Sequence, residues 1–495
     1  MISGAAAAPT GRLPSDAVAH LAAYQRRVGA GDRAESNVAL LSTEGTLAVA
    51  TGQQPGLFGG PLLTLHKAAT AVARADALAR ATGRPVVPVF WIASEDHDVA
   101  EIDRAVVLDA AGVPRALSLG LVPDRKSAAD ARLEPAALAR LMAELAAALP
   151  ATDRAAEAVA LARPPAEADL GSWFATILAR VLGDSGLVFV EPYQLAPYAG
   201  DVYAMLLERA ETIEAGVRAE GVARRARGEA APLERAAGTA PLFLRDAPRG
   251  VRGRVTLDGN SVRVRDRVST LDRRLLMAVL RQEPELASGD VVGRVFVQNA
   301  LLPVVEIVAG PTELAYLTQV GAGARAVERP FPVLVPRASA LWLDGKSVES
   351  LKAFGFDAVA VAEGRTVPPA ATSDAGPDAL SEELDGLLRR ATEVRDAAVS
   401  ALGADGGSSV VARDLEAVRG GIERARAHRR DEREALLGRG KARYERLVNA
   451  LRPIGEPQER VLSPLSLIAR HGVGALGDGL NSLGSADGAR VIRLP

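Results

Sequence analysis

The sequence has 495 residues, of which 48% are apolar, and its formal net charge is −2. This length suffices for two or three domains, and the near-neutral charge indicates no global attraction to nucleic acid or to a membrane surface. Cysteine is absent, which excludes disulfides, a thiolate nucleophile and zinc held by cysteine. No apolar run approaches the roughly 20 residues of a membrane span, and no secretory signal is evident, so we expect a cytoplasmic enzyme.

After a helix expected at 16–28, a strand–helix–strand pattern occupies residues 45–98. An apolar, β-prone run at 47–50 precedes a glycine-rich turn, and an apolar helical pattern at 61–82 leads to a second apolar run at 86–92. Both strands of such a βαβ unit end at the same edge of a parallel sheet, where ligands of open α/β sheets bind. We therefore expect the segments that follow the two strands to line one shared pocket.

The first of these segments, TGQQPGLFGGP at 51–61, has the composition of an anion site. Its four glycines permit positive φ and a close approach of the backbone to a ligand. The amino end of the helix that follows would offer unpaired N–H groups to a phosphate. A tight connection without a ligand is the alternative. The candidate nucleotide- or substrate-binding residues here are Thr51, Gly52, Gln53, Gln54, Gly56 and Gly60.

The second segment, FWIASEDHD at 90–98, places His97 among three carboxylates. His97 is a candidate proton carrier whose imidazolium the carboxylates favour, or a metal ligand together with them. If the strand continues, Glu95 and His97 face one side and Asp96 and Asp98 the other, whereas a turn would gather more of them. A salt-bridged structural turn is the alternative. We take His97, Asp96 and Asp98 as catalytic candidates, Trp91 and Glu95 as binding candidates, and assign no metal ligand.

Further along, short strands are expected at 106–108 and 117–121, helices at 135–161 and 173–182, and a buried strand at 187–190. Residues 1–199 thus form the first part of the core. A charged helix at 202–227 and a hairpin from 242–244 and 251–264 indicate an inserted α+β segment at 200–285. The sheet pattern returns at 291–297, 304–308 and 331–335, so 286–364 is the second part of the core.

A linker at 365–378 precedes two long helical patterns within 379–452. Apolar residues at 3/4 spacing around charged faces predict an antiparallel coiled-coil hairpin, with a helix pair packed inside the main domain as the alternative. The exposed apolar face of such an arm predicts a homodimer. Residues 453–495 are expected to return to the core and to end in a strand at 490–494.

Polar residues in both parts of the core extend the candidate site. Arg294, Arg337 and Lys67 are candidates for binding substrate anions, because guanidinium forks suit carboxylate or phosphate. Gln298 is a further binding candidate. His66 is expected to be a surface or core histidine. The GxGxxA match at 321–326 follows a helical stretch, not a strand, so we regard it as chance.

These segments together resemble the bacillithiol-synthesis cysteine-adding enzyme family (BshC). The resemblance rests on TGQQPGLFGGPLLTLHKA, PVFWIASEDHDVAEI, RVFVQNALLP from Arg294, AGPTELAY from Ala309, VPRASA from Val335 and QER from Gln458. It implies an α/β protein with a Rossmann-like, nucleotidyltransferase-type parallel-sheet core, inserted segments and the helical coiled-coil arm. The related class I aminoacyl-tRNA synthetases hold ATP phosphates with a signature at their first βα turn. In this chain Gln53, Gln54 and Gly56 occupy that place, without the two histidines of the signature.

The resemblance also implies the last step of bacillithiol assembly, in which the carboxyl of L-cysteine is joined to the amine of glucosaminyl-malate. Adenylation by ATP with Mg²⁺ would activate the carboxyl, His97 would take the amine proton, and Arg294 or Arg337 would hold the malate carboxylates. Two rival functions remain open at this point. One is a metal-dependent hydrolase using Glu95, Asp96, His97 and Asp98, and the other is a nucleotide-binding scaffold that acts through its coiled coil.

Overall fold

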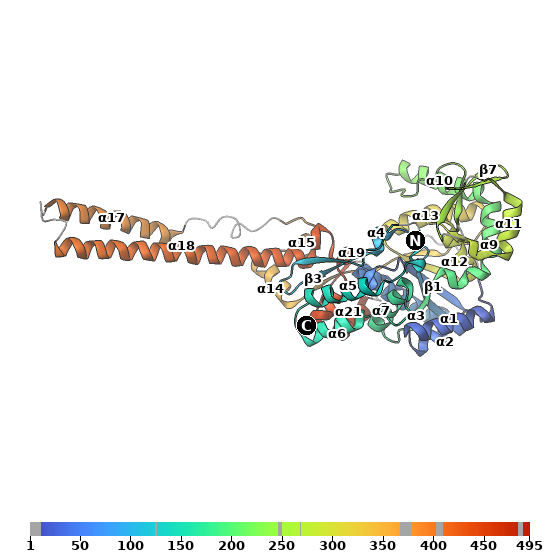
Figure 1. The fold of residues 1–495 in the computed structure, drawn as a ribbon, viewed down its shortest axis with the longest axis horizontal. Coiled ribbons are helices and arrows are strands. Elements are labelled where there is room, and N and C mark those ends of the chain that lie inside the picture. The colour runs from blue at the N-terminus through green and yellow to red at the C-terminus, as the bar shows by residue number, and fades with distance from the viewer. Residues whose placement is uncertain are drawn as a thin grey trace. The chain divides into compact units, whose positions relative to one another are not determined.

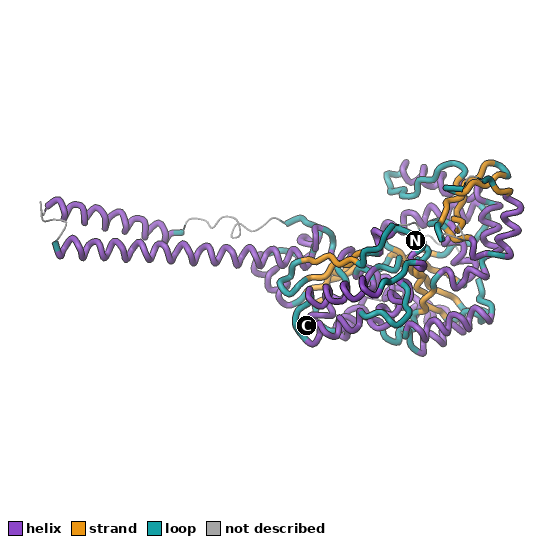
Figure 2. Tube along the Cα trace, viewed as in Figure 1, coloured by secondary structure: helices purple, strands orange, loops and turns teal. Residues whose placement is uncertain are grey.

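The structure is a computed structural model that describes residues 11–123, 126–245, 250–267, 269–366, 378–401, 409–483 and 489–495. The described chain divides into two compact units, one within Met1–Asp344 and Glu456–Pro495 and the other within Gly345–Gly455. Helices predominate (Figure 2). In the part of the chain that is described, no helix has the length and apolarity that crossing a membrane requires.

A five-stranded sheet forms the centre of the first unit, with the order β12-β11-β1-β2-β5 and every neighbouring pair parallel. From β1 the chain adds two strands on one side and then two on the other, so the switch point lies between β1 and β11. This is the doubly wound order of a Rossmann-like fold, which confirms the predicted fold class. The strands are β1 (Leu47–Gln53), β2 (Val86–Ile92), β5 (Val188–Val190), β11 (Val304–Ala309) and β12 (Val333–Pro336).

The central strands are apolar without alternation because both faces of the sheet are covered. On one face, Val49 packs against Ala71 and Ala75 of α3 (Leu62–Thr82), and on the other Ala48 and Ala50 join the larger core. That larger core includes residues of α1 (Ser15–Val28), α2 (Asp32–Leu40), α9 (Gly200–Glu208), α10 (Ala210–Ala226) and α13 (Pro311–Ala326). The predicted strand–helix–strand unit is therefore present, with α3 joining β1 to β2.

The region between β2 and β5 is more broken than predicted. β3 (Arg104–Leu108) and β4 (Pro114–Ser118) form an antiparallel pair. The single helix expected at 135–161 is two helices, because the chain leaves the helix before Pro150 and Thr152 caps a new one by accepting the N–H of Ala155. The other elements are α4 (Val99–Ile102), η2 (Ala128–Asp130), α5 (Pro135–Ala148), α6 (Asp153–Ala162) and α7 (Leu170–Leu182).

The inserted segment holds a second sheet, which is antiparallel and has the order β10-β6-β7-β8-β9, where a single hairpin had been expected. The predicted strand at 291–297 is wrong: this run lies in helix α12, whose start the Asp290 carboxylate caps by accepting the N–H groups of Val292 and Gly293. A short apolar run fits a buried helix as well as a strand. Elements of the insert lie beside one another in Figure 1. They include β6 (Thr239–Arg245), β7 (Arg252–Asp258), β8 (Ser261–Val264), β9 (Leu271–Asp272) and α11 (Arg273–Gln282). β10 (Ala287–Gly289) and α12 (Gly293–Leu301) follow the insert in the chain.

The C-terminal segment returns to the first unit. The last strand, β14 (Ala489–Arg493), pairs in parallel with β13 (Ser339–Leu343) in a separate two-stranded sheet. The remaining elements of this unit are η1 (Leu57–Gly59), α8 (Pro192–Leu195), η3 (Ala196–Tyr198), η4 (Pro284–Leu286), α19 (Gln458–Val461), α20 (Pro464–His471) and α21 (Val473–Leu483).

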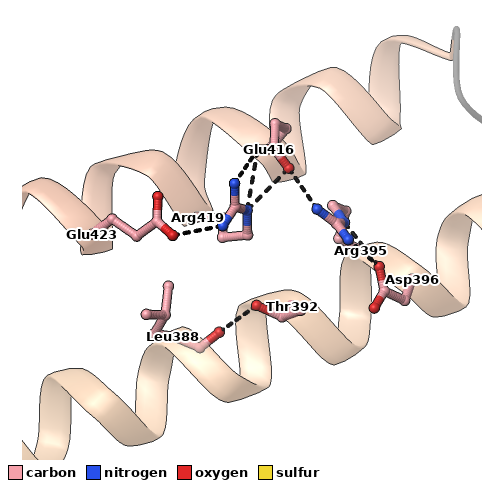
Figure 3. A network of polar contacts seen from close by, with 7 residues as sticks. All are labelled: Leu388, Thr392, Arg395, Asp396, Glu416, Arg419 and Glu423. Carbon is pink, nitrogen blue, oxygen red and sulfur yellow. Dashed lines mark hydrogen bonds and ion pairs between the residues drawn. The ribbon is translucent and has the colours of Figure 1, made fainter.

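Two long helices dominate the second unit, α17 (Ala379–Ala401) and α18 (Val410–Leu451). They are antiparallel, because Arg395 pairs with Glu416 while Asp385, nearer the start of α17, pairs with Arg426, further along α18. Figure 3 shows Glu416 between the guanidinium groups of Arg395 and Arg419. The described residues leave out 367–377, within the linker predicted at 365–378, and 402–408, between the two long helices. The unit also contains α14 (Gly345–Phe354), α15 (Ala358–Ala362) and η6 (Pro453–Gly455).

Candidate active site

A cavity of about 620 Å³ lies at the carboxyl edge of the parallel sheet. Residues at or after the ends of all five strands line it: 52–54 from β1, 93 and 95–98 after β2, Pro192 after β5, 310–313 after β11, and Arg337 after β12. The two segments that the sequence singled out therefore share one pocket. This is the place where open α/β sheets bind ligands, next to the switch point.

The turn after β1 contributes its glutamines to this cavity. Gln54 donates a hydrogen bond from Nε2 to Oδ2 of Asp96 at 2.7 Å, which joins the two turns directly. Lys67 of α3 is buried, and its Nζ donates to the carbonyl of Gly52 at 2.9 Å and to Oε1 of Gln53 at 2.8 Å. The same ammonium pairs with Glu313 at 2.5 Å, so its three donors are used within the protein.

Several predicted binding residues of the first turn do not face the cavity. Gly56 has a φ of −66° and Gly60 a φ of 71°, and neither lines the cavity, because residues 56–60 pack inwards around η1. The Leu62 N–H at the start of α3 donates to the carbonyl of Leu462 at 3.0 Å. This N–H group of the predicted anion site is therefore already bonded within the protein. Thr51 is also internal, its hydroxyl donating to the Val308 carbonyl at 2.9 Å.

After β2 the chain turns, so residues 95–98 all line the cavity together with Trp91. The carboxylate of Asp96 accepts the N–H groups of His97 at 2.7 Å and of Asp98 at 3.3 Å, in addition to Gln54. Burial opposes ionisation of Asp96, but these hydrogen bonds outweigh it and lower its pKa. Asp96 is thus a structural anion that holds the turn.

The pKa of His97 shifts in the direction opposite to the one predicted. Its Nδ1 lies 3.5 Å from Nη1 of Arg252 and 3.9 Å from Oδ1 of Asp96, and its ring meets Phe243 edge-on at 5.8 Å. Burial and the Arg252 guanidinium lower the pKa of His97, although the carboxylates of Asp96 and Asp98 act in the opposite direction. The surroundings of His97 therefore disfavour the expected carboxylate-stabilised imidazolium.

Glu95 differs from its neighbours. Burial raises its pKa to about 7, against the opposing effect of the Arg252 and Arg245 guanidinium groups. Its backbone carbonyl accepts a hydrogen bond from Nη1 of Arg252. Its carboxylate makes no hydrogen bond to any of the described residues, although Glu95 lines the cavity.

The two arginines predicted to bind substrate anions differ in whether a carboxylate of the protein already pairs with them. Arg337 donates two hydrogen bonds to Glu459, at 2.8 and 2.6 Å, so a carboxylate already occupies its fork. Arg294, on α12, donates to the hydroxyl of Tyr316 and has no carboxylate hydrogen-bonded to it among the described residues. Both line the cavity, whereas Gln298, on the same helix as Arg294, is buried and does not.

Sequence reasoning missed the contribution of the inserted antiparallel sheet. Arg252 of β7 reaches the turn after β2, donates also to Ser288 at 3.0 Å and Gly289 at 3.3 Å, and stacks over the Phe243 ring at 4.4 Å. Arg254 lies over the same ring at 5.4 Å. The alternation of arginines along 252–254 was visible in the sequence, but nothing local indicated that this strand would meet the core.

His66 is structural. Its Nε2 accepts a hydrogen bond from the Trp342 indole at 3.0 Å, so its Nδ1 carries the proton and donates to Glu459 at 3.0 Å. Within the described residues, no three histidine, aspartate or glutamate side chains are grouped as metal ligands. The proposed metal cluster of Glu95, Asp96, His97 and Asp98 is thus not formed by the arrangement of these side chains.

A doubly wound sheet with a polar cavity at its carboxyl edge defines a Rossmann-like enzyme with a small-molecule site. The family model described as "Bacillithiol biosynthesis BshC, N-terminal Rossmann-like domain" matches residues 10–338. This chain belongs to the BshC family, a family of ligases, as the segment resemblance had indicated.

Relatives along most of the chain bear the name "Putative cysteine ligase BshC". The protein of Heliobacterium modesticaldum is 32% identical over 400 residues, which are 75% of this chain and 71% of the relative. The protein of Salinibacter ruber is 31% identical over 472 residues, 91% of this chain and 83% of the relative. The protein of Geobacillus kaustophilus is 29% identical over 473 residues, 92% of this chain and 85% of the relative. The similarity thus extends beyond the Rossmann-like domain.

Proposed function

We propose that this protein joins the carboxyl of L-cysteine to the amine of glucosaminyl-malate, with ATP as the activating substrate. The proposal rests on one observation: the acidic turn, two glutamine amides and the Arg294 guanidinium line the same cavity at the sheet edge. Family membership supports the ligase chemistry and the cysteine substrate.

Amide formation from a free carboxylate is uphill, so the carboxyl needs an activated leaving group. In the proposed route, a cysteine carboxylate oxygen attacks the α-phosphorus of ATP and pyrophosphate leaves. The sugar amine then attacks the cysteinyl carbonyl, and AMP leaves with the electron pair of the broken C–O bond. Because ATP and reduced cysteine are cytoplasmic metabolites, we place the reaction in the cytoplasm.

The cavity offers groups that suit a nucleotide triphosphate. The amides of Gln53 and Gln54 line it, and so does the amino end of α13 at 310–313, where the helix dipole favours an anion. We assign the phosphates to the amino end of α13, although the Gly310 N–H there donates to the Glu313 carboxylate at 2.8 Å, because α13 faces the cavity and the Leu62 N–H of α3 is bonded to the Leu462 carbonyl. Mg²⁺ would arrive with the phosphates, because such sites hold it through substrate phosphates, water and one or two carboxylates and not through an all-protein cage.

The malate carboxylates fit Arg294 better than Arg337. A guanidinium binds a carboxylate through two parallel N–H groups, and Arg337 already spends such a pair on Glu459. Arg294 faces the same cavity with only the Tyr316 hydroxyl as a hydrogen-bond partner among the described side chains. We therefore assign substrate-anion binding to Arg294.

The first prediction concerns the two half-reactions. Purified protein with Mg²⁺ should show cysteine-dependent exchange of pyrophosphate into ATP, and addition of glucosaminyl-malate should yield the amide. Arg294→Gln should raise the KM for glucosaminyl-malate by about 10- to 100-fold, the loss of one charge-assisted contact, while exchange persists.

Arg281→Gln is the matched control, because Arg281 is a half-exposed arginine paired with Asp201 and does not line the cavity. Absence of both exchange and product would refute the proposed function. ATP binding without turnover would instead favour the nucleotide-binding scaffold.

We also propose that the protein is a homodimer joined through α17 and α18 as a coiled coil. Leu380, Leu387 and Val394 recur at heptad spacing on α17, and each is about half exposed: 51%, 50% and 49%. Val411 and Val418 repeat the pattern on α18, with 57% and 55% exposed. The predicted apolar pattern included Leu387, Val394 and Val418 among these residues. The helix pair leaves them exposed, and a second copy of the chain can cover them.

The second prediction follows from this stripe. Leu387→Lys combined with Val394→Lys should convert a dimer into a monomer in light scattering at micromolar concentration, because two buried charges per chain would oppose association. Val222→Lys, at a 61% exposed position of α10, is the control and should leave the mass unchanged. A monomeric wild-type protein, or a double variant that stays dimeric, would contradict this interface.

A further inference from the structure

We propose that Glu95, and not His97, is the general base that accepts the proton of the attacking amine, an assignment that rests on the proposed function. The sequence had favoured His97 because of the three carboxylates around it. In the folded chain, however, the four residues of this acidic turn have different partners.

The carboxylate of Glu95 is available to accept a proton. Glu95 lines the cavity, and its carboxylate makes no hydrogen bond to a described residue. The Asp96 carboxylate instead holds Gln54 and two backbone N–H groups, so its lone pairs are engaged. The Nδ1 of His97 faces the Arg252 guanidinium at 3.5 Å. A general base must reach the proton it removes, and among these three Glu95 is the one without a competing partner.

Arg252 holds Glu95 in position through its main chain. Arg252 donates to the Glu95 carbonyl and, at the same time, to Ser288 and Gly289 of β10. The turn after β2 is therefore fixed by the antiparallel sheet through main-chain contacts, and the side chain of Glu95 is left for chemistry. Preorganisation of this kind keeps a catalytic group in position at little entropic cost.

The charges around the turn favour a proton on Glu95 over a proton on His97. Among the described residues, the charged and titratable groups that face Glu95 from other elements are Arg252 of β7, Arg245 of β6 and Tyr203 of α9. Burial raises the pKa of Glu95 to about 7, where a base is most effective at neutral pH. A proton on Glu95 removes a buried charge, whereas a proton on His97 would create a cation beside Arg252. Burial, and after it this repulsion by Arg252, lower the pKa of His97.

In the step itself, the amine nitrogen forms a bond to the carbonyl carbon of the activated cysteine. The proton that the nitrogen loses passes to a carboxylate oxygen of Glu95. The bond from the carbonyl carbon to the phosphate oxygen breaks, and its electron pair leaves with AMP. Glu95 returns the proton to solvent before the next turnover.

The third prediction tests this assignment with Glu95→Gln, which keeps the shape of the side chain. Ligation should fall about 100-fold or more, the usual contribution of a general base, while cysteine-dependent pyrophosphate exchange should stay within about threefold of wild type. The pH profile of kcat/KM for glucosaminyl-malate should lose its acidic limb near pH 7. Glu95→Asp should retain that limb at a reduced rate.

Glu191→Gln is the matched control. Burial also raises the pKa of Glu191 to about 7, but its carboxylate accepts the Tyr24 hydroxyl at 2.5 Å and does not line the cavity. This variant should keep the acidic limb. The assignment is overturned if Glu95→Gln ligates at a near wild-type rate, or if His97→Gln removes the limb while Glu95→Gln retains it. Absence of pyrophosphate exchange in the wild-type protein would refute the proposed function and, with it, this step.

Discussion

Glu459→Gln should lower the free energy of unfolding by about 3–5 kcal/mol, the range measured when one member of a buried ion pair is removed. The Glu459 carboxylate accepts hydrogen bonds from His66 at 3.0 Å, from Arg337 at 2.8 and 2.6 Å and from Ser339 at 2.7 Å. The Arg337 side chain is only 7% exposed, so glutamine would leave its charge buried without a counterion. Chemical denaturation at pH 7 would measure the loss.

The stabilisation that Glu459 provides should decrease as the pH falls. Burial opposes ionisation of Glu459, but His66 and Arg337 outweigh it and hold its pKa far below the ordinary 4.5. A carboxyl whose pKa is lower when folded stabilises the protein above its unfolded pKa, and the contribution is lost as the pH falls. The difference between wild type and Glu459→Gln should therefore be full above about pH 4.5 and shrink below it.

Glu35→Gln provides the comparison in the same unit. Glu35 pairs with Arg26 at 2.5 Å on the surface, where the arginine side chain is 59% exposed. Exposed pairs of this kind contribute less than about 1 kcal/mol. Equal effects at the two sites would contradict the role given to burial around Glu459.

Gly293→Ala should destabilise the protein by about 3 kcal/mol or more, at the upper end of overpacking effects. A Cβ at Gly293 would overlap the main-chain oxygen of Pro241 in β6 and lie 3.3 Å from the side chain of Leu206. Backbone cannot move aside as a flexible side chain can. The start of α12 would be displaced, and Arg294 with it, so anion binding should weaken together with stability. Thermal unfolding and the KM for glucosaminyl-malate would report both changes.

Gly477→Ala is the control for the substitution itself. Gly477 lies within α21, and a Cβ there meets no atom within 4 Å. Alanine should stabilise the protein by about 0.5–1 kcal/mol, because glycine costs conformational entropy in a helix. If Gly293→Ala were tolerated as well as Gly477→Ala, the close approach of α12 to β6 would not be a constraint.

The sequence indicated the strands of the βαβ unit and the pocket they share because these features depend on local periodicity and chain direction. It failed at 291–297, where a short apolar run has no period that separates strand from helix. It also placed Leu387 and Val394 in the seam between the long helices, but both are half exposed. Leu384 and Ala391, which the same 3/4 pattern included, are partly buried as expected, and Leu388 is partly buried as well.

The amino-acid sequence by itself determined the Rossmann-like core, the acidic and glutamine-bearing turns at its edge and the family. Each of these can be recognised from short runs of consecutive residues. Only the tertiary structure decided which polar groups are free to act. Arg337 meets Glu459, Lys67 meets Glu313, and Arg252 arrives from the inserted sheet beside His97 and Glu95. The physical reason is that partners, burial and pKa depend on residues brought together from distant parts of the chain, which no local pattern contains.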